Sequence, residues 1–154
     1  MAQLNYKVLK ESGYQGFILE KAPEKVMQFG EGNFLRAFAD DFIDIANEKA
    51  GFNGKAALVQ PIAEGLTDLI NKQEGLYTLY LRGSEKGVRV DEKRVISAVS
   101  RCINPYSDWD QVLEIARSSD LTRCPLGEKI TGYFLEEIRG PGAVRETLQK
   151  VLNS

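Results

Sequence analysis

The stretch from Lys25 to Phe38, KVMQFGEGNFLRAF, joins a short apolar run to a glycine-containing loop and the first turns of a helix. The run KVMQF stops at Gly30, as a buried strand does. Beyond the loop, apolar residues recur at spacings of four, four and three, which places them on one helical face: Phe34, Phe38, Phe42 and Ile45. Gly51 is suited to end this helix. The stretch therefore predicts a strand, a glycine loop and an amphipathic helix in succession.

A second apolar run, AALVQPI, extends from Ala56 to Ile62, and Pro61 ends it or places it at a sheet edge. Strand, loop, helix and strand in this order make a βαβ unit, which predicts an α/β fold. The helix also carries a group of acids that we interpret as its solvated face, with a carboxylate metal site as the less favoured alternative: Asp40, Asp41, Asp44 and Glu48.

The middle of the chain has a different pattern. Closely spaced strand-like segments without helical spacers favour an antiparallel β insertion: 76–81, 88–90 and 94–103. A short helix is then expected over 108–117 with Ser107 as its N-cap, and two more helices are expected over 128–138 and 144–152. We therefore divide the chain into an α/β domain over 1–120 and a helical tail over 121–154.

The composition excludes several classes of function. The 154 residues carry 20 basic and 22 acidic side chains, a net charge of -2, which disfavours binding to nucleic acid or to an acidic membrane surface. A signal peptide, a membrane-spanning run and a CxxC pair are all missing, so we expect a cytoplasmic protein in which Cys102 and Cys124 are reduced. Without histidine, the sequence offers no Ser-His or Cys-His nucleophile and no imidazole ligand for a metal.

The glycine loop is suited to a dinucleotide. Gly30 permits a tight turn, Gly32 lets a pyrophosphate approach backbone N–H groups at a helix N-terminus, and Arg36 offers a charged contact. A third glycine would fall at Leu35, and Gln60 stands where an acid usually holds the ribose. The residues alone therefore leave open whether the cofactor is NAD or NADP, and whether the loop is merely a strand-to-helix turn.

Several segments, in order and spacing, resemble one known family: FGEGNFLRAF (29–38), LVQPI (58–62), QEGLYTLYLRG (73–83) and RVISAVSRCINPYSDWD (94–110). They are similar to the N-terminal part of the tagaturonate reductases, or altronate oxidoreductases, of the mannitol dehydrogenase-like family. The resemblance implies a Rossmann-like NAD domain of an oxidoreductase acting between tagaturonate and altronate in hexuronate breakdown. It explains the missing third glycine, since the family pattern is G-x-G-x-F-x-R-A. The cofactor-binding residues it implies are Phe29, Gly30, Gly32, Asn33, Phe34 and Arg36.

The resemblance changes character near Asp120 and Leu121. The residues beyond that point look like the extreme C-terminus of the family, so we interpret the chain as an incomplete Rossmann-like domain joined to a C-terminal tail with the region between them removed. The family's catalytic pattern, K-x-x-x-x-N-x-x-H, is not found in these 154 residues. No catalytic residue is therefore assigned, and we expect a chain that is inactive alone. The alternatives are an NAD-binding remnant and a module that forms homo-oligomers through an exposed sheet edge.

Overall fold

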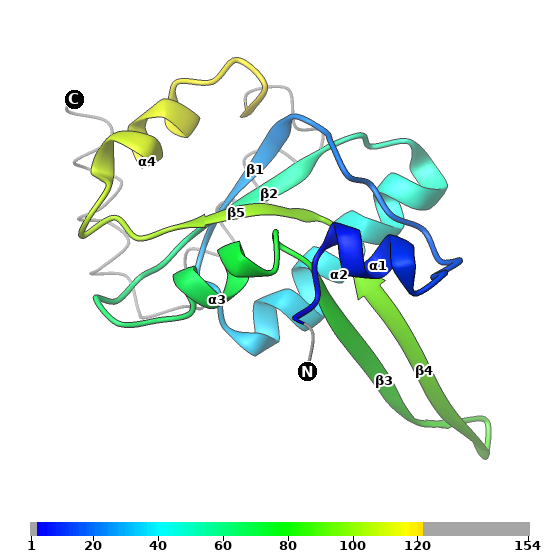
Figure 1. Cartoon of the computed structure of the whole chain (residues 1–154). Helices are drawn as coiled ribbons and strands as arrows, with labels where there is room; N and C mark the ends of the chain where they lie inside the picture. The colour runs from blue at the N-terminus through cyan, green and yellow to red at the C-terminus, as the bar shows by residue number, and fades with distance from the viewer. Residues whose placement is uncertain (1–2, 122–154) are drawn as a thin grey trace.

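The computed structural model describes residues 3–121, in which strands and helices alternate around a small sheet (Figure 1). The helices are α1 (Tyr6–Glu11), α2 (Asn33–Ala50), α3 (Thr67–Lys72) and α4 (Trp109–Ala116). The strands are β1 (Glu24–Phe29), β2 (Lys55–Val59), β3 (Tyr77–Glu85), β4 (Val88–Ile96) and β5 (Val99–Ile103). None of the helices in this part of the chain is long and apolar enough to cross a lipid bilayer.

The central sheet is parallel and confirms the predicted βαβ unit. Its strand order is β1-β2-β5, with Met27 opposite Ala57 and Leu58 opposite Cys102. Every residue of β2 is buried, as expected for the middle strand of a sheet that is covered on both faces. The carboxyl ends of the three strands meet at one edge, which is where α/β proteins bind their ligands.

Alternate residues of the strands enter two separate cores. On one face, Val26, Ala56 and Leu58 pack with Ile43 of α2 and Ile70 of α3. On the other face, the apolar side chains pack with α4: Met27, Phe29, Ala57, Val59 and Ile103 against Val112, Ile115 and the partly buried Trp109. The fold is therefore a three-layer α/β arrangement.

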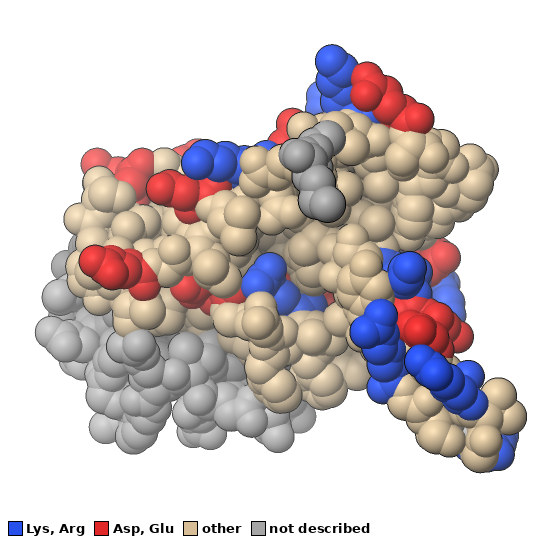
Figure 2. Space-filling view, turned by 60° about the horizontal axis from the view of Figure 1, so that its bottom comes forward, with Lys and Arg blue, Asp and Glu red and all other residues tan. Residues whose placement is uncertain are grey.

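The predicted antiparallel insertion is a hairpin of β3 and β4. The two strands pair from Tyr77 opposite Ile96 to Glu85 opposite Val88, and the hairpin projects from the body of the domain (Figure 1). Lys and Arg side chains lie along it and acidic side chains lie nearer the body, whereas its tip is mostly formed by other residues (Figure 2). The segment 94–103, expected to be continuous, is split at Ser97 and Ala98 between β4 and the parallel strand β5. The split arises because Ser97 leaves the hairpin to bond Asp44 of α2 through both its backbone N–H and its hydroxyl, at 2.8 and 3.0 Å.

The faces of α2 differ from those expected, although Glu48 is exposed as predicted. Asp40 and Asp44 are completely buried, so the prediction of a solvated acidic face is wrong for both. Three phenylalanines that were expected to share the apolar face of this helix are instead exposed: Phe34 by 62%, Phe38 by 49% and Phe42 by 57%. The buried stripe of the helix is made of Leu35, Ala39, Ile43 and Asn47 together with the two aspartates. Burial of Asp44 is possible because Arg94 and Ser97, distant in sequence, bond both of its carboxylate oxygens.

This arrangement predicts unequal effects for two neighbouring residues of α2. Phe42→Ala should change the free energy of unfolding by less than about 1 kcal/mol, because the ring is mostly in solvent. Ile43→Ala should lower it by about 2–5 kcal/mol, because it empties space in a closed core. Urea denaturation of both variants, followed by circular dichroism, checks this. A larger loss for Phe42→Ala would show that the helix is turned the other way.

Smaller differences concern helix starts. Asp108, rather than the expected Ser107, is the N-cap of α4, and its side chain accepts a hydrogen bond from the Gln111 N–H. Helices α1 and α3 were not expected, because each spans six residues and shows little periodicity. The two expected tail helices, over 128–138 and 144–152, lie outside the described residues.

The predicted exposed sheet edge concerns the outer strands β1 and β5, neither of which pairs with a further strand among the described residues. Val26 to Phe29 of β1 are all less than a tenth exposed. On β5, the Asn71 side chain of α3 binds the edge, since it accepts from the Cys102 N–H and donates to the Cys102 carbonyl, both at 2.8 Å. The Asn71 amide thus pairs with the edge of β5 at this one residue.

Candidate functional site

Gly30 forms the turn at the carboxyl end of β1. Its φ of 121° lies in a region that side chains rarely adopt, so glycine is required by the backbone itself. Its N–H donates to the Val59 carbonyl of β2 at 2.9 Å, which extends the parallel pairing by one residue. The chain is thus hydrogen bonded to the sheet up to Gly30, the residue at which it turns toward α2.

Gly32 is the N-cap of α2, and no side chain among the described residues caps this helix. A Cβ placed on Gly32 would meet nothing within 4 Å, so there is open space beside this residue. The first N–H groups of a helix have no acceptor within it, and in an 18-residue helix they carry the positive end of the dipole. The loop therefore presents donors to an open space, as an anion site requires.

Arg36 and Asn33 lie within this first turn and hold the loop together. The Arg36 guanidinium donates to the Glu31 carbonyl at 2.9 Å and to Asn33 Oδ1 at 2.6 Å. It also lies over the ring of Tyr77, 5.2 Å from the ring centre. The structure thus brings Gly30, Gly32, Asn33 and Arg36 together.

The two predicted phenylalanines are not part of this polar arrangement. Phe29 is 6% exposed and its side chain lies in the core beneath α4. Phe34 points into solvent and stacks on Phe38 with a separation of 5.7 Å between ring centres. Phe29 can therefore contribute only backbone groups to the loop. Phe34 places an exposed ring beside the start of α2.

A layer of polar residues beneath the loop was missed by the sequence reasoning. Gln28 is completely buried and its Nε2 donates to the Gly30 carbonyl at 3.0 Å. The Tyr77 hydroxyl donates to the Arg36 carbonyl at 2.5 Å and lies 3.4 Å from Asp40 Oδ2. Burial raises the pKa of Asp40 to about 7, an effect that Tyr77 and Arg36 partly oppose. A glutamine inside an otherwise apolar strand, two residues before Gly30, was the available signal.

Gln60, at the end of β2, is occupied by internal contacts. Its Nε2 donates to the carbonyls of Ile62 and Ala63, and its Oε1 accepts from the N–H and the hydroxyl of Thr67. Gly65 packs against it so closely that a Cβ there would lie 2.5 Å from the Gln60 amide and from Glu31 Oε1. Gln60 therefore fixes the loop after β2 against the glycine loop.

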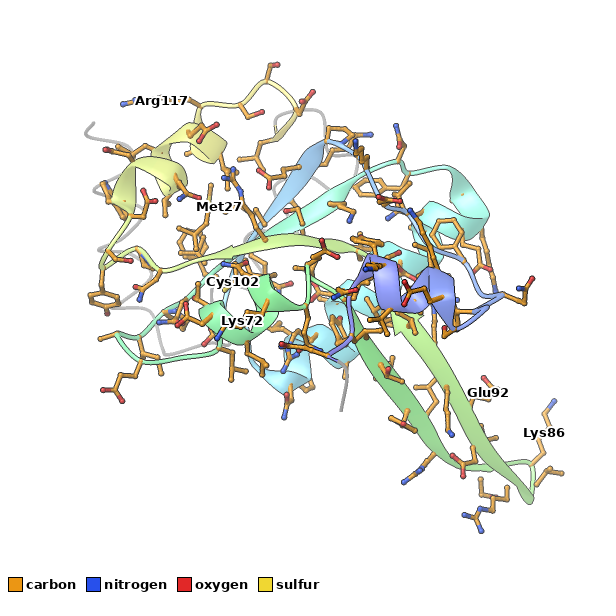
Figure 3. The ribbon with its side chains drawn as sticks, viewed as in Figure 1. Met27, Lys72, Lys86, Glu92, Cys102 and Arg117 are labelled. Carbon is orange, nitrogen blue, oxygen red and sulfur yellow. The ribbon has the colours of Figure 1, made fainter. Side chains whose placement is uncertain are left out.

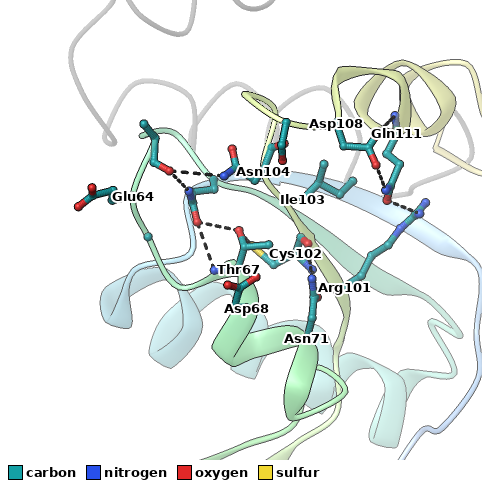
Figure 4. A pocket seen from close by; sticks show the side chains of 14 residues that line it. Glu64, Thr67, Asp68, Asn71, Arg101, Cys102, Ile103, Asn104, Asp108 and Gln111 are labelled. Carbon is teal, nitrogen blue, oxygen red and sulfur yellow. Dashed lines mark hydrogen bonds between the residues drawn. The ribbon is translucent and has the colours of Figure 1, made fainter.

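A pocket of about 500 Å³ opens next to this loop, beyond the carboxyl ends of β2 and β5 and between α3 and α4 (Figure 4). Polar side chains make up much of its wall, including Glu64, Asp68, Asn71, Asn104 and Asp108. Asp68 stands in the first turn of α3 and Asp108 caps α4. The pocket has room for a polar group of moderate size and offers it several carboxylates.

Two other candidate chemistries receive no support from the described residues. Cys102 lies within the fold (Figure 3), and burial raises the pKa of its thiol to about 11, which keeps it protonated and unreactive. Within residues 3–121, no three Cys, Asp or Glu side chains are arranged to hold a metal ion. The acids of α2 bind arginine, serine and tyrosine side chains instead.

Comparison with known proteins finds similarity over most of this chain. The family model for the mannitol dehydrogenase Rossmann domain matches residues 24–153. Altronate oxidoreductase from Halalkalibacterium halodurans is 39% identical over 123 residues, which are 79% of this chain and 24% of that protein. Altronate oxidoreductase from Bacillus subtilis (strain 168) is 46% identical over 99 residues, 64% of this chain and 21% of that protein. The chain thus spans about a quarter of the length of these relatives.

Two solved structures share the fold. Mannitol 2-dehydrogenase from Pseudomonas fluorescens, in a ternary complex with NAD and D-mannitol, superposes with a TM-score of 0.64 at 22% identity, over 78% of this chain and 25% of that one. D-sorbitol dehydrogenase in substrate-free form gives a TM-score of 0.56 at 17% identity, over 86% of this chain and 32% of that one. At these identities the structures show a common, partial Rossmann-like fold.

Proposed function

The chain belongs to the mannitol dehydrogenase family, and we propose that it is the dinucleotide-binding portion of an NAD-dependent oxidoreductase. The observation that carries the proposal is the start of α2 after Gly30 and Gly32, which no side chain of the described residues caps and which has open space beside Gly32. The backbone N–H groups of this turn would bind the pyrophosphate, and Asn33 and Arg36 would hold the loop in place. The NAD named in the mannitol 2-dehydrogenase complex supports this choice of cofactor.

The adenosine half of the cofactor is assigned to the neighbouring pocket. In many dinucleotide-binding proteins an acid at the end of the second strand holds the ribose, and here Gln60 occupies that place with its polar atoms already bonded. Glu64 and Asp68, which follow in the loop and in α3, line the pocket and supply carboxylates for the ribose hydroxyls. A carboxylate at this point favours NAD over NADP, because it repels a 2′-phosphate.

The relatives are named altronate oxidoreductases, which supports the same substrate class for the enzyme to which this portion would belong. We assign the chain to the interconversion of tagaturonate and altronate as the cofactor-binding part of such an enzyme, without the proton-transfer residues. The sequence has no histidine and no lysine at the K-x-x-x-x-N-x-x-H spacing of the family. We therefore propose that this chain binds NAD and does not turn over a sugar acid by itself.

Self-association through a sheet edge, the alternative considered from the sequence, is less favoured. The residues of β1 that would form such an edge are buried, and Asn71 bonds the edge of β5. Dinucleotide binding is therefore the function that the described residues support best.

The test is a titration of the purified 154-residue chain with NADH, following emission of Trp109, the single tryptophan. We expect saturable binding, and Gly32→Asp should weaken it about tenfold or more, because a carboxylate would stand where the pyrophosphate binds. The same substitution should not destabilise the fold, since the position has space, an extended backbone and an N-cap role that aspartate fills well.

Gly83→Asp is the matched control. Gly83 lies in the exposed hairpin, also has nothing within 4 Å of its Cβ position, and receives the same added charge. It should leave NADH affinity unchanged. Equal affinities for the Gly32 and Gly83 variants would rule out the glycine loop as the site, and steady oxidation of NADH with tagaturonate would refute the absence of turnover.

A further inference from the structure

Tyr77 of β3 contacts Arg36 of α2 at both ends of the arginine. Its hydroxyl donates to the Arg36 carbonyl at 2.5 Å. Its ring faces the Arg36 guanidinium, with 5.2 Å between the ring centre and the central guanidinium carbon. The two residues are 41 positions apart in sequence, and both are half-buried. One side chain at the base of the hairpin thus holds both the backbone and the charged group of an arginine near the start of α2.

The helix does not need either contact to be complete. The Arg36 carbonyl lies inside an 18-residue helix, where it accepts from the N–H four residues further on. An arginine near a helix start that borders open space would otherwise extend its charge into water. A guanidinium held over an aromatic ring gains a cation–π attraction instead. The contacts with Tyr77 therefore select one orientation of the Arg36 side chain.

That orientation is the one that closes the glycine loop. The Arg36 Nε donates to the Glu31 carbonyl at 2.9 Å, and one Nη donates to Asn33 Oδ1 at 2.6 Å. Glu31 and Asn33 flank Gly32, so the guanidinium bridges the residues on either side of the helix N-cap. A swing of the side chain into water would break both hydrogen bonds at once.

We propose that Tyr77 is a positioning residue for the glycine loop and acts through Arg36: the hydroxyl fixes the ring against α2, and the ring holds the guanidinium on the loop. The loop then keeps the N–H groups at the start of α2 in place for an anion. The base of the hairpin, distant in sequence, is thereby coupled to the loop. The effect of Tyr77 on cofactor affinity rests on the proposed dinucleotide site, whereas its effect on the order of the loop does not.

The first measurement needs no ligand. In the full chain, hydrogen exchange of the Arg36 Nε–H, followed by nitrogen-15 NMR, should be slow because this group is bonded to a backbone carbonyl. Tyr77→Leu should speed the exchange about tenfold, since it removes the ring and the hydroxyl together. Tyr77→Phe keeps the ring and should lie between the two. Unchanged exchange in Tyr77→Leu would overturn the proposal.

Two residues of the same strand supply the controls. Tyr80→Leu is the same substitution at an exposed tyrosine whose ring also faces a guanidinium, that of Arg82 at 5.0 Å. Leu79 is a core residue, so Leu79→Ala lowers stability through lost packing. Both variants should keep the wild-type exchange of the Arg36 Nε–H. An equal acceleration in Leu79→Ala would mean that the exchange follows general stability, and the proposal would be wrong.

The second measurement is the dissociation constant for NADH, followed by Trp109 emission. Tyr77→Leu should raise it about tenfold, because a loop that is less often in its binding arrangement has a lower apparent affinity. In an Arg36→Gln background the same substitution should have little further effect, since Tyr77 acts through Arg36. Equal effects of Tyr77→Leu in the two backgrounds would contradict the proposal.

The outcomes separate this proposal from the proposed function. If NADH binds and Tyr77→Leu binds it as tightly as the wild type does, Tyr77 does not position the loop for the cofactor. If the wild-type chain does not bind NADH, the proposed function fails, and the exchange of the Arg36 Nε–H still decides whether Tyr77 holds the loop. If Tyr77→Leu does not fold, Tyr77→Phe decides: wild-type exchange and wild-type affinity in that variant overturn the proposal.

Discussion

Replacing Asp44 with asparagine is expected to lower the free energy of unfolding by about 3 kcal/mol or more, since it breaks a buried ion pair. Asp44 has no exposed surface, and both of its carboxylate oxygens are fully used. Oδ1 accepts from the Ser97 N–H at 2.8 Å and from the Ser97 hydroxyl at 3.0 Å. Oδ2 accepts from two nitrogens of Arg94, at 3.0 and 2.6 Å. An asparagine would point its NH2 group at either Ser97 or Arg94, and the donors on that side would then lack an acceptor.

Asp40→Asn is the matched control for this prediction. It is the same substitution one helical turn earlier, at an equally buried carboxyl group. Among the described residues, no arginine donates a hydrogen bond to Asp40 and one of its oxygens lacks a donor, so asparagine should preserve or raise stability at neutral pH. Urea denaturation of both variants at pH 7 measures the difference. Equal losses would show that the two acids are held alike and would contradict the contrast drawn between them.

Strand β1 and the glycine loop after it were predictable because they depend on neighbours in sequence. KVMQF followed by glycine marks β1 correctly to within one residue, and the loop to helix transition lies where Gly30 and Gly32 place it. The hairpin was predictable for the same reason, because turn-forming residues separate two segments of high β propensity. These features are decided by backbone conformation and local pattern.

The orientation of α2 was not predictable from its own pattern. Phenylalanines at spacings of four predict a helix face that packs in the core. The partners of the buried Asp44, however, are Arg94 and Ser97, about 50 residues further along the chain. Such distant contacts decide which face of the helix is buried, and the spacing of apolar residues within the helix does not reveal them. The same holds for the layer under the loop, where Tyr77 reaches Arg36 across 41 positions of sequence.

Gly75→Ala is the second substitution with a large expected effect, a loss of about 3 kcal/mol in the free energy of unfolding. Gly75 connects α3 to β3 with a φ of 78°, which an alanine adopts at a cost of about 1–2 kcal/mol. A Cβ there would also lie 2.3 Å from the Val99 carbonyl oxygen, a backbone atom that cannot rotate away. Either the turn or the start of β5 must move, and Val99 is completely buried.

Gly87→Ala separates the two contributions, because Gly87 has a φ of 81° and nothing within 4 Å of its Cβ position. It should lose about 1 kcal/mol from backbone strain alone, and the remaining loss in Gly75→Ala then measures the contact with Val99. Because β3 begins two residues after Gly75 and carries Tyr77, displacement of the turn should also weaken NADH binding, whereas Gly87→Ala should not. Equal losses of stability in the two variants would mean that the turn at Gly75 does not pack against Val99 of β5. The hairpin alone would then have to hold Tyr77 against α2.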